Sequence, residues 1–286
     1  RALASFPNVN AALLGPTPFG ESEIGNARGL QVIARIGVGY DAVDVPALTR
    51  VGVPLMTTGI ANSPSVAEQA VFFMMQLSKK ANELHGLVRT GKWAQRFAHL
   101  PVDLLEKTVL VVGFGRIGTR TAKRCLAMEM NVLVYDPYVK PDAIRTAGCE
   151  PVTDLDDALS RCDYLTLHCP KTKETAGMIN AARIGRMKPS AFLVNTARGG
   201  IVDEKALFAA LASKRLAGAG LDVFEQEPPP ADNPLLALDN VITAPHVAGV
   251  TREAVDRMSE QTARNILSAL DGAPIRANVI NQDVLG

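Results

Sequence analysis

Short, continuous apolar runs alternate with helix-like segments along the second part of the chain. The runs are rich in β-branched residues and read as strands buried on both faces of a parallel sheet. Segments between most of them, such as 117–128 and 204–213, have the apolar spacing of helices. The pattern therefore predicts an α/β fold whose large, doubly wound parallel sheet contains six strands. These strands are expected at 109–112, 132–135, 164–167, 192–195, 219–223 and 241–243.

The first hundred residues predict a second, smaller α/β domain. Strands are expected there at 11–14, 32–36 and 53–56, and two long helices, one from about Ser65 and one over 252–270, are expected to connect the domains. The small domain would then be discontinuous, formed by residues 1–81 and 266–286, and the large domain would span 82–265. Because residue 1 enters partway through a βα unit, we expect the N-terminus of this domain to be truncated.

The composition of the chain indicates which kinds of partner and setting to expect. The 286 residues carry a formal net charge of +1, which does not favour nucleic acid or a membrane surface as a partner. No apolar run approaches the ~20 residues that cross a bilayer. The four cysteines form no C-x-x-C pair, so we expect a reducing, cytoplasmic setting and no metal site.

A glycine-rich turn follows the first strand of the large sheet. The segment Gly113-Phe-Gly115-Arg-Ile-Gly118 joins that strand to a helix. Such a turn needs one glycine for its sharp bend, one for close approach of a pyrophosphate and one for helix packing. The helix N-terminus then presents free N–H groups to the phosphates. The motif predicts a dinucleotide site and a Rossmann-type large domain.

An acidic residue ends the next strand. Asp136 comes eighteen residues after Gly118, where a carboxylate accepts hydrogen bonds from the ribose hydroxyls and repels a 2′-phosphate. Pro137 and Tyr138 follow it, and no arginine is there to receive such a phosphate. The sequence therefore favours NAD over NADP.

Three polar residue types follow the last three strands, at the edge where open α/β sheets build their sites. Arg198 follows the fourth strand, and its guanidinium suits a carboxylate or a developing alkoxide. His246 follows the sixth strand, and a histidine side chain can donate or accept a proton. Glu227 and Glu225 both follow the fifth strand, and local sequence does not choose between them. His168, at the end of the third strand, is first interpreted as structural, with a possible place beside the cofactor.

Together these motifs resemble the D-isomer-specific 2-hydroxyacid dehydrogenases. The resemblance runs from about Ala11 to Asn278 and is carried by Arg35-Ile-Gly-Val-Gly-Tyr-Asp-Ala-Val-Asp44, Asn62-Ser-Pro-Ser-Val-Ala-Glu68, Gly113 to Gly118, Leu167-His-Cys-Pro170, Asn195 to Gly200, Asp222 to Pro228 and Ala244-Pro-His246. It implies a flavodoxin-like small domain that binds substrate. Pro64 stands where the family often has no proline, and no C-terminal regulatory module is expected after Gly286.

The resemblance implies a role for each catalytic candidate. Arg198 would orient the acid and polarise its 2-oxo group, and His246 would be the acid/base. The family's glutamate directly precedes a proline, which selects Glu227 as the partner of His246. The reaction would interconvert a small D-2-hydroxy acid and its 2-keto acid with NAD, in a cleft between the domains.

The resemblance also assigns binding positions. The substrate would contact Arg35, Val38, Gly39, Arg198 and His246. The cofactor would contact Thr58, Gly113, Gly115, Arg116, Ile117, Gly118, Asp136, His168, Cys169, Pro170, Thr175, Thr196, Ala197, Arg198, Asp222, His246 and Gly249. A homodimer is expected, with the segment 89–104 as a candidate interface or a plain surface connection.

Two other functions share this fold. One is an NAD(H)-sensing, corepressor-like binding protein, which a test for NADH consumption would separate from an enzyme. The other is a formate- or phosphite-type dehydrogenase. Formate enzymes of this fold pair their histidine with glutamine, so Glu227 argues against formate.

Overall fold

In the computed structural model, which describes residues 9–25, 27 and 29–286, the chain forms two units. Unit 1 contains residues 1–63 and 249–286, and unit 2 contains residues 64–248. The division therefore falls at the start of one long helix and just before the other. The expected boundary at 265/266 lies within the second of these helices, and the expected boundary at 81/82 lies three residues after the end of the first.

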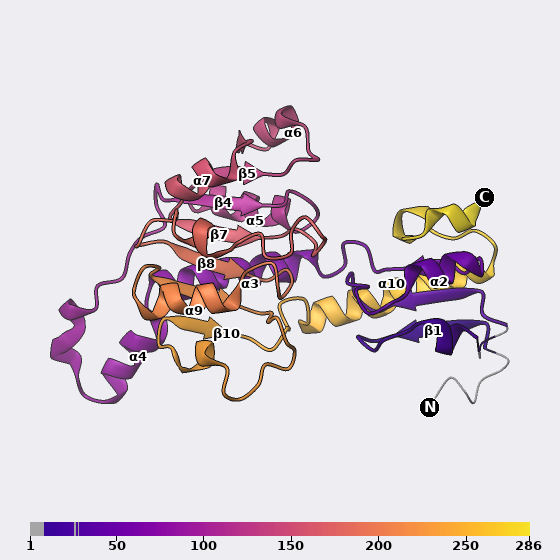
Figure 1. Ribbon diagram of the computed structural model, residues 1–286, viewed down its shortest axis with the longest axis horizontal. Coiled ribbons are helices and arrows are strands. Elements are labelled where there is room, and N and C mark those ends of the chain that lie inside the picture. The colour runs from indigo at the N-terminus through magenta and orange to yellow at the C-terminus, as the bar shows by residue number, and fades with distance from the viewer. Residues whose placement is uncertain (1–8, 26, 28) are drawn as a thin grey trace. The chain divides into compact units, whose positions relative to one another are not determined.

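A seven-stranded parallel sheet forms the centre of unit 2 (Figure 1). Its order is β10-β9-β8-β7-β4-β5-β6, so the chain reverses direction across the sheet between β4 and β7. The six predicted strands are confirmed, and β6 is an additional short strand at one edge. The strands are β4 (Thr108–Val112), β5 (Asn131–Tyr135), β6 (Glu150–Val152), β7 (Tyr164–Leu167), β8 (Phe192–Asn195), β9 (Gly218–Leu221) and β10 (Val241–Thr243).

Alternate residues of these strands pack into two cores, one on each face of the sheet. In β4, Leu110 and Val112 join the core with α7 (Leu155–Arg161), α8 (Ala181–Ile184) and α9 (Glu204–Ala212). Val109 and Val111 join the core with α3 (Ser63–Ser78), α5 (Gly118–Ala127) and α6 (Pro141–Thr146). A strand covered on both faces is apolar throughout, which explains the continuous runs in the sequence.

Helix α3 packs on the large sheet through Ala70, Phe73 and Met74, all of which are buried. It begins at Ser63, and Pro64 occupies its first turn. Proline is well tolerated there because the first-turn N–H groups have no partner within the helix. Pro64 therefore starts the helix that follows the Thr58 loop.

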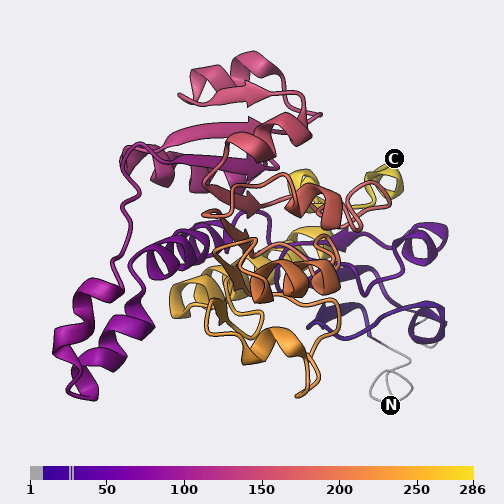
Figure 2. The same ribbon diagram turned by 60° about the vertical axis from the view of Figure 1, so that its left-hand side comes forward.

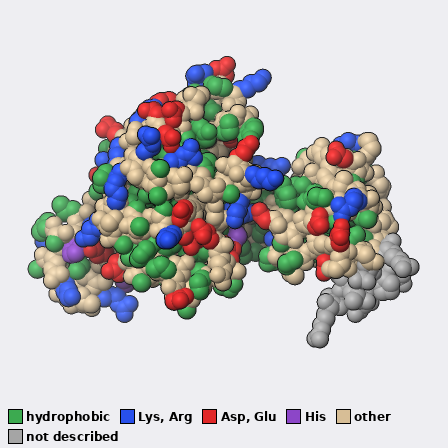
Figure 3. Space-filling view, viewed as in Figure 1, with side chains coloured by type: hydrophobic (Ala, Val, Ile, Leu, Met, Phe, Trp, Pro, Cys, Tyr) green, Lys and Arg blue, Asp and Glu red, His purple; other side chains and the backbone are tan. Residues whose placement is uncertain are grey.

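A helical arm, residues 81–98, extends away from the sheet of unit 2 (Figures 1 and 2). It consists of α4 (Ala81–Arg89) and the 3-10 helix η2 (Trp93–Ala98). The side chains of Trp93 and Phe97 are 61% and 69% exposed, and Arg96 stacks on the Phe97 ring at 4.4 Å. Hydrophobic side chains gather over this arm in the space-filling view (Figure 3).

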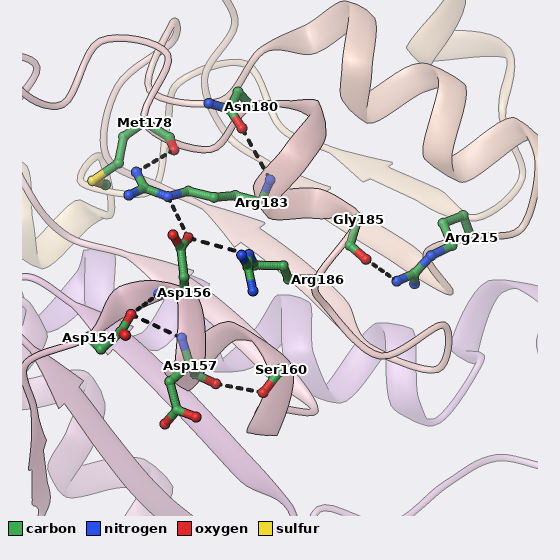
Figure 4. A network of polar contacts seen from close by, with 10 residues as sticks. All are labelled: Asp154, Asp156, Asp157, Ser160, Met178, Asn180, Arg183, Gly185, Arg186 and Arg215. Carbon is green, nitrogen blue, oxygen red and sulfur yellow. Dashed lines mark hydrogen bonds and ion pairs between the residues drawn. The ribbon is translucent and has the colours of Figure 1, made fainter.

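A polar network ties α8, together with the loop before it, to α7 (Figure 4). The Asp156 carboxylate accepts a hydrogen bond from Nε of Arg183 at 2.9 Å, and Nη1 of Arg183 donates to the carbonyl of Met178. No predicted site residue belongs to this network. A further short helix, η3 (Pro234–Ala237), precedes β10.

Unit 1 contains a three-stranded parallel sheet in the order β1-β2-β3. Its strands are β1 (Ala11–Leu14), β2 (Val32–Arg35) and β3 (Leu55–Met56), and its helices are α1 (Glu21–Ile24), α2 (Val45–Arg50), α10 (Arg252–Leu270), η4 (Arg276–Asn278) and η5 (Gln282–Leu285). Helix α10 contacts β1 and β2, and its Asn265 donates a hydrogen bond to the carbonyl of Thr57 at 2.8 Å. The C-terminal segment is thereby part of this unit.

Candidate active site

The glycine-rich turn lies between β4 and α5, as the sequence predicts. A Cβ atom at Gly113 would lie 2.8 Å from the backbone of His168 and Cys169, and one at Gly118 would lie 1.9 Å from the carbonyl oxygen of Gly113. At Gly115 a Cβ would meet nothing within 4 Å. Two glycines are therefore required by packing, and the third leaves open space where a pyrophosphate would approach.

Asp136 joins this turn to the end of β5. One of its carboxylate oxygens accepts the Phe114 N–H at 2.7 Å, and the other accepts the Tyr138 N–H at 2.9 Å. Each carboxylate oxygen has a second acceptor position, which suits the hydroxyls of an adenosine ribose. The turn, the helix N-terminus and this acid together fit a dinucleotide.

The segment after β7 contains four predicted cofactor positions. Thr175 donates to the carbonyl of Pro170 at 2.6 Å, which folds residues 170–175 into a closed turn. Nε2 of His168 lies 3.0 Å from the Thr166 hydroxyl, and its Nδ1 is buried. Burial lowers the pKa of His168 to about 3 and raises the pKa of Cys169 to about 11, so the imidazole and the thiol are both uncharged at neutral pH.

Arg198 lies on a loop that is fixed from both ends. The Asn195 side chain accepts the Ala197 N–H at 3.0 Å and donates to the carbonyl of Arg198 at 2.9 Å. A Cβ at Gly199 would lie only 1.7 Å from the carbonyl oxygen of Phe224. The loop after β8 is therefore pressed against the loop after β9.

The side chains of His246 and Glu227 are in direct polar contact. Nδ1 of His246 lies 2.6 Å from Oε2 of Glu227, and the Phe224 N–H donates to Oε1 at 3.0 Å. The side chains are 50% and 35% exposed. Glu225 points elsewhere, since it exchanges hydrogen bonds with Glu204 at the start of α9. Geometry thus separates the two glutamates that local sequence leaves equivalent.

Asp222 organises the segment that carries the histidine. Its buried carboxylate accepts the N–H groups of Val247 and Ala248 at 2.9 Å each, and its carbonyl accepts the His246 N–H at 2.8 Å. Burial is the main cause that raises the pKa of Asp222. His246 itself adopts a left-handed backbone conformation, with φ of 55°. Asp222 therefore holds the backbone of the loop in which His246 lies.

The loops after β8, β9 and β10 thus meet at one edge of the sheet. Asn195 pairs in register with Leu221, and Leu221 pairs with Thr243, so the segments leave the sheet side by side. They bring a guanidinium-bearing loop next to an imidazole–carboxylate pair. This combination of groups suits acid/base chemistry on an anionic oxygen compound.

The predicted residues of unit 1 also lie close together along the chain. Arg35 ends β2 and donates to the carbonyl of Ile36, and Val38 and Gly39 follow shortly after it in the chain. The Thr58 N–H donates to the carbonyl of Gly37 at 3.1 Å. The remaining predicted positions, Arg116, Ile117, Thr196 and Ala197, lie on the loops of unit 2, and Gly249 begins the second segment of unit 1.

Two contributors were absent from the predicted site. Asn195 is 2% exposed at the end of an apolar strand, and a buried asparagine in that position is a sequence signal of a loop anchor. The Tyr138–Glu174 hydrogen bond, at 2.7 Å, joins residues 36 positions apart and has no such signal. Among residues 9–25, 27 and 29–286, no cluster of His, Cys, Asp or Glu is arranged to hold a metal ion. In the same residues no helix is long and apolar enough to cross a membrane.

Comparison with known proteins identifies relatives of the whole arrangement. Residues 71–248 match the family model described as D-isomer specific 2-hydroxyacid dehydrogenase, NAD binding domain. The chain is 43% identical over 255 residues to a D-3-phosphoglycerate dehydrogenase of Archaeoglobus fulgidus, covering 89% of this chain and 48% of the relative. It is 40% identical over 263 residues to a glyoxylate reductase of Thermofilum pendens, covering 91% of this chain and 77% of that one.

A solved structure extends the similarity to the fold. The D-lactate dehydrogenase of Aquifex aeolicus, complexed with NAD and lactic acid, superimposes with a TM-score of 0.87 at 32% identity, covering 100% of this chain and 88% of the other. The chain spans about half the length of the D-3-phosphoglycerate dehydrogenases it matches.

Proposed function

Because the chain belongs to the D-isomer specific 2-hydroxyacid dehydrogenases, we propose that it interconverts a small D-2-hydroxy acid and its 2-keto acid. NAD is the cofactor, and when bound it accepts or supplies the hydride at carbon 2. The phosphate turn, the N-terminus of α5 and Asp136 would hold its adenosine and pyrophosphate part. The single observation that carries the proposal is the 2.6 Å contact between His246 and Glu227, in a loop adjoining that of Arg198.

His246 is the proposed acid/base. With Nδ1–H donated to Glu227, Nε2 is the nitrogen left to exchange a proton with the substrate oxygen. In reduction it would donate a proton to the carbonyl oxygen, and in oxidation it would accept one from the hydroxyl. Glu227 fixes the ring orientation and stabilises the positive charge that the ring carries when Nε2 is protonated.

Arg198 is the proposed substrate clamp. Its Nη1 donates to the carbonyl of Ala197 at 2.7 Å, which steadies the guanidinium, and the Asn195 contacts hold the loop below it. A planar guanidinium can bind the acid's carboxylate and stabilise negative charge on its 2-oxo group. In unit 1, Arg35 and the N–H groups of Val38 and Gly39 are proposed contacts of the substrate.

The helical arm is a proposed dimer interface. It presents Val88, Trp93 and Phe97, each at least 60% exposed, and aromatic residues of this kind are enriched in interfaces. Two copies of the chain would bury these side chains against each other. Sedimentation equilibrium should give twice the monomer mass, and Trp93→Ser with Phe97→Ser should shift the equilibrium to monomer.

A panel of 2-keto acids tests the proposed reaction. Purified protein is mixed with NADH and glyoxylate, hydroxypyruvate, pyruvate or 3-phosphohydroxypyruvate, and the loss of NADH absorbance is followed. We expect turnover with at least one acid and, for every acid except glyoxylate, whose product glycolate is achiral, a D-configured product by chiral chromatography. NADH binding without turnover on any acid of the panel would contradict the proposal and favour a binding protein.

A further inference from the structure

A second carboxylate lies near the adenosine end of the predicted dinucleotide site. We propose that Glu174, positioned by Tyr138, discriminates against NADP and so acts together with Asp136 in selecting NAD. The proposal rests on NAD as the cofactor and on the place of Asp136 beside the ribose. It does not depend on which acid is reduced.

Tyr138 is bonded to both carboxylates. Its backbone N–H donates to Oδ1 of Asp136 at 2.9 Å, and its hydroxyl donates to Oε2 of Glu174 at 2.7 Å. Tyr138 is 79% exposed, so the contact with Glu174 contributes nothing to the buried core. Tyr138 therefore links the two carboxylates, one through its backbone N–H and the other through its hydroxyl. The Glu174 contact and charge raise the pKa of Tyr138, which keeps its hydroxyl a hydrogen-bond donor.

The position of this link relates it to the cofactor. Asp136 and Tyr138 follow β5, and Glu174 lies in the loop after β7. Strand β4 lies between β5 and β7 in the sheet, and it leads directly into the phosphate turn. The Tyr138–Glu174 bond therefore crosses the end of the strand from which the pyrophosphate is bound. Adenosine, which extends from the pyrophosphate to Asp136, would lie next to it.

Glu174 is held in place by its own loop. Its N–H donates to the Thr172 hydroxyl at 3.2 Å, and the Thr172 N–H donates to the Thr175 hydroxyl at 2.8 Å. Lys171 directs its amino group towards Gly200, on the β8 side. Lys173 is adjacent in sequence, so the loop as a whole is not acidic. Glu174 is distinguished by the hydrogen bond that its carboxylate accepts from Tyr138, the residue that is also bonded to Asp136.

Electrostatics then separates the two dinucleotides. NAD carries a ribose hydroxyl where NADP carries a phosphate of charge about −1.5 to −2. Two carboxylates near that position repel the phosphate but not the hydroxyl. At this exposure the repulsion from Glu174 is screened by water and salt, and we expect it to change NADP affinity about three- to tenfold.

Calorimetric titration of the unliganded protein with NADH and NADPH tests the proposal without turnover. Glu174→Gln removes the charge but keeps an oxygen that accepts from Tyr138. We expect NADPH to bind about three- to tenfold more tightly, NADH to change less than twofold, and the gain to shrink in 1 M KCl. Tyr138→Phe should give a smaller gain in NADPH affinity, because Glu174 keeps its charge and loses only its hydrogen bond to the tyrosine hydroxyl. Asp239→Asn, before β10 at the opposite edge of the sheet, is the matched control.

An unchanged ratio of NADPH to NADH affinity in Glu174→Gln would overturn the proposal. Equal tightening of both dinucleotides, or the same gain in Asp239→Asn, would overturn it too, since either is a general charge effect. A gain in Glu174→Gln with none in Tyr138→Phe would overturn the positioning role of the tyrosine. Because no acid is present in these titrations, each of these results leaves the proposed dehydrogenase reaction unaffected.

Discussion

Gly199 and Phe224 touch so closely that no side chain fits between them. A Cβ on Gly199 would lie 1.7 Å from the Phe224 carbonyl oxygen and 2.8 Å from the amide nitrogen of Glu225. Both neighbours are backbone atoms, which cannot rotate away as the end of a side chain can. The loop that carries Arg198 is therefore held directly against the loop that carries Glu227.

We expect Gly199→Ala to separate these two loops. Arg198 and Glu227 would then lose their relative placement, and we expect turnover to fall at least a hundredfold, since small misplacements of reacting groups have effects of this size. NADH affinity should change much less. Steady-state kinetics and calorimetric titration measure the two effects. Gly86→Ala, where a Cβ meets nothing within 4 Å, is the matched control, and equal turnover in both variants would contradict the argument.

His246→Ala removes the proposed acid/base. Proton transfer by a positioned side chain is worth about 10²–10⁴ in rate, so turnover should fall by that factor. Because the ring contacts Glu227 on the surface, folding should be little affected. Single-turnover absorbance measurements would report the loss, and unchanged NADH binding would show that the site is intact. Turnover near that of the unaltered protein would exclude the role.

Glu227→Gln tests the pairing rather than the imidazole. The amide oxygen can still accept the Phe224 N–H, but the NH₂ group then faces Nδ1 of His246 and forces it to act as an acceptor. The proton moves to Nε2, which favours a neutral ring that cannot accept a proton from the hydroxy acid. We expect turnover to fall about 10- to 100-fold, more in oxidation than in reduction. An equal fold-loss of turnover in both directions would argue against the pairing.

The sequence predicts the buried strands of this molecule better than it predicts the edge strand and the tertiary contacts. Strands β4, β5, β7, β8 and β9 are buried on both faces, so their apolar runs could be recognised in one dimension. The edge strand β6, Glu150-Pro151-Val152, could not, because an edge strand tolerates proline and polar residues.

The candidate site, too, can be predicted from the sequence only in part. The glycine turn is a local motif, so its place could be predicted. Which of Glu225 and Glu227 contacts His246 depends on Glu204, which lies twenty-one residues from Glu225. Glu204 and Glu225 exchange two hydrogen bonds, and these hold Glu225 away from the histidine. Packing against different elements also decides that α3 belongs with unit 2 and α10 with unit 1, although both have the length of a connecting helix. These outcomes depend on tertiary contacts that no local pattern contains.

Arg198→Ala should strongly reduce keto-acid reduction while NADH still binds. Removing one group that stabilises a developing oxyanion costs about 10²–10³ in turnover, and the KM for the acid should rise as well. Arg198→Lys should recover little, because a lysine lacks the planar fork of a guanidinium. The kinetics of both variants on the acid found active in the panel measure this. Restoration of full efficiency by lysine would mean that only charge, not the clamp geometry, is needed.

His168 should make the stability of the protein depend on pH. Burial lowers its pKa from 6.5 to about 3, so below pH 6.5 the unfolded chain binds a proton that the folded protein does not. Protonation of His168 therefore does not lower the free energy of unfolding above pH 6.5. As the pH falls from 6.5 towards 3, it lowers the free energy of unfolding by up to about 1.4 kcal/mol per pH unit. Urea unfolding of the protein and of His168→Gln between pH 7 and 4 measures this. The variant should lose less stability over that range, while His85→Gln, which changes an exposed histidine of α4, should follow the unaltered protein. Parallel curves for His168→Gln and the unaltered protein would show that the ring is protonated equally in both states.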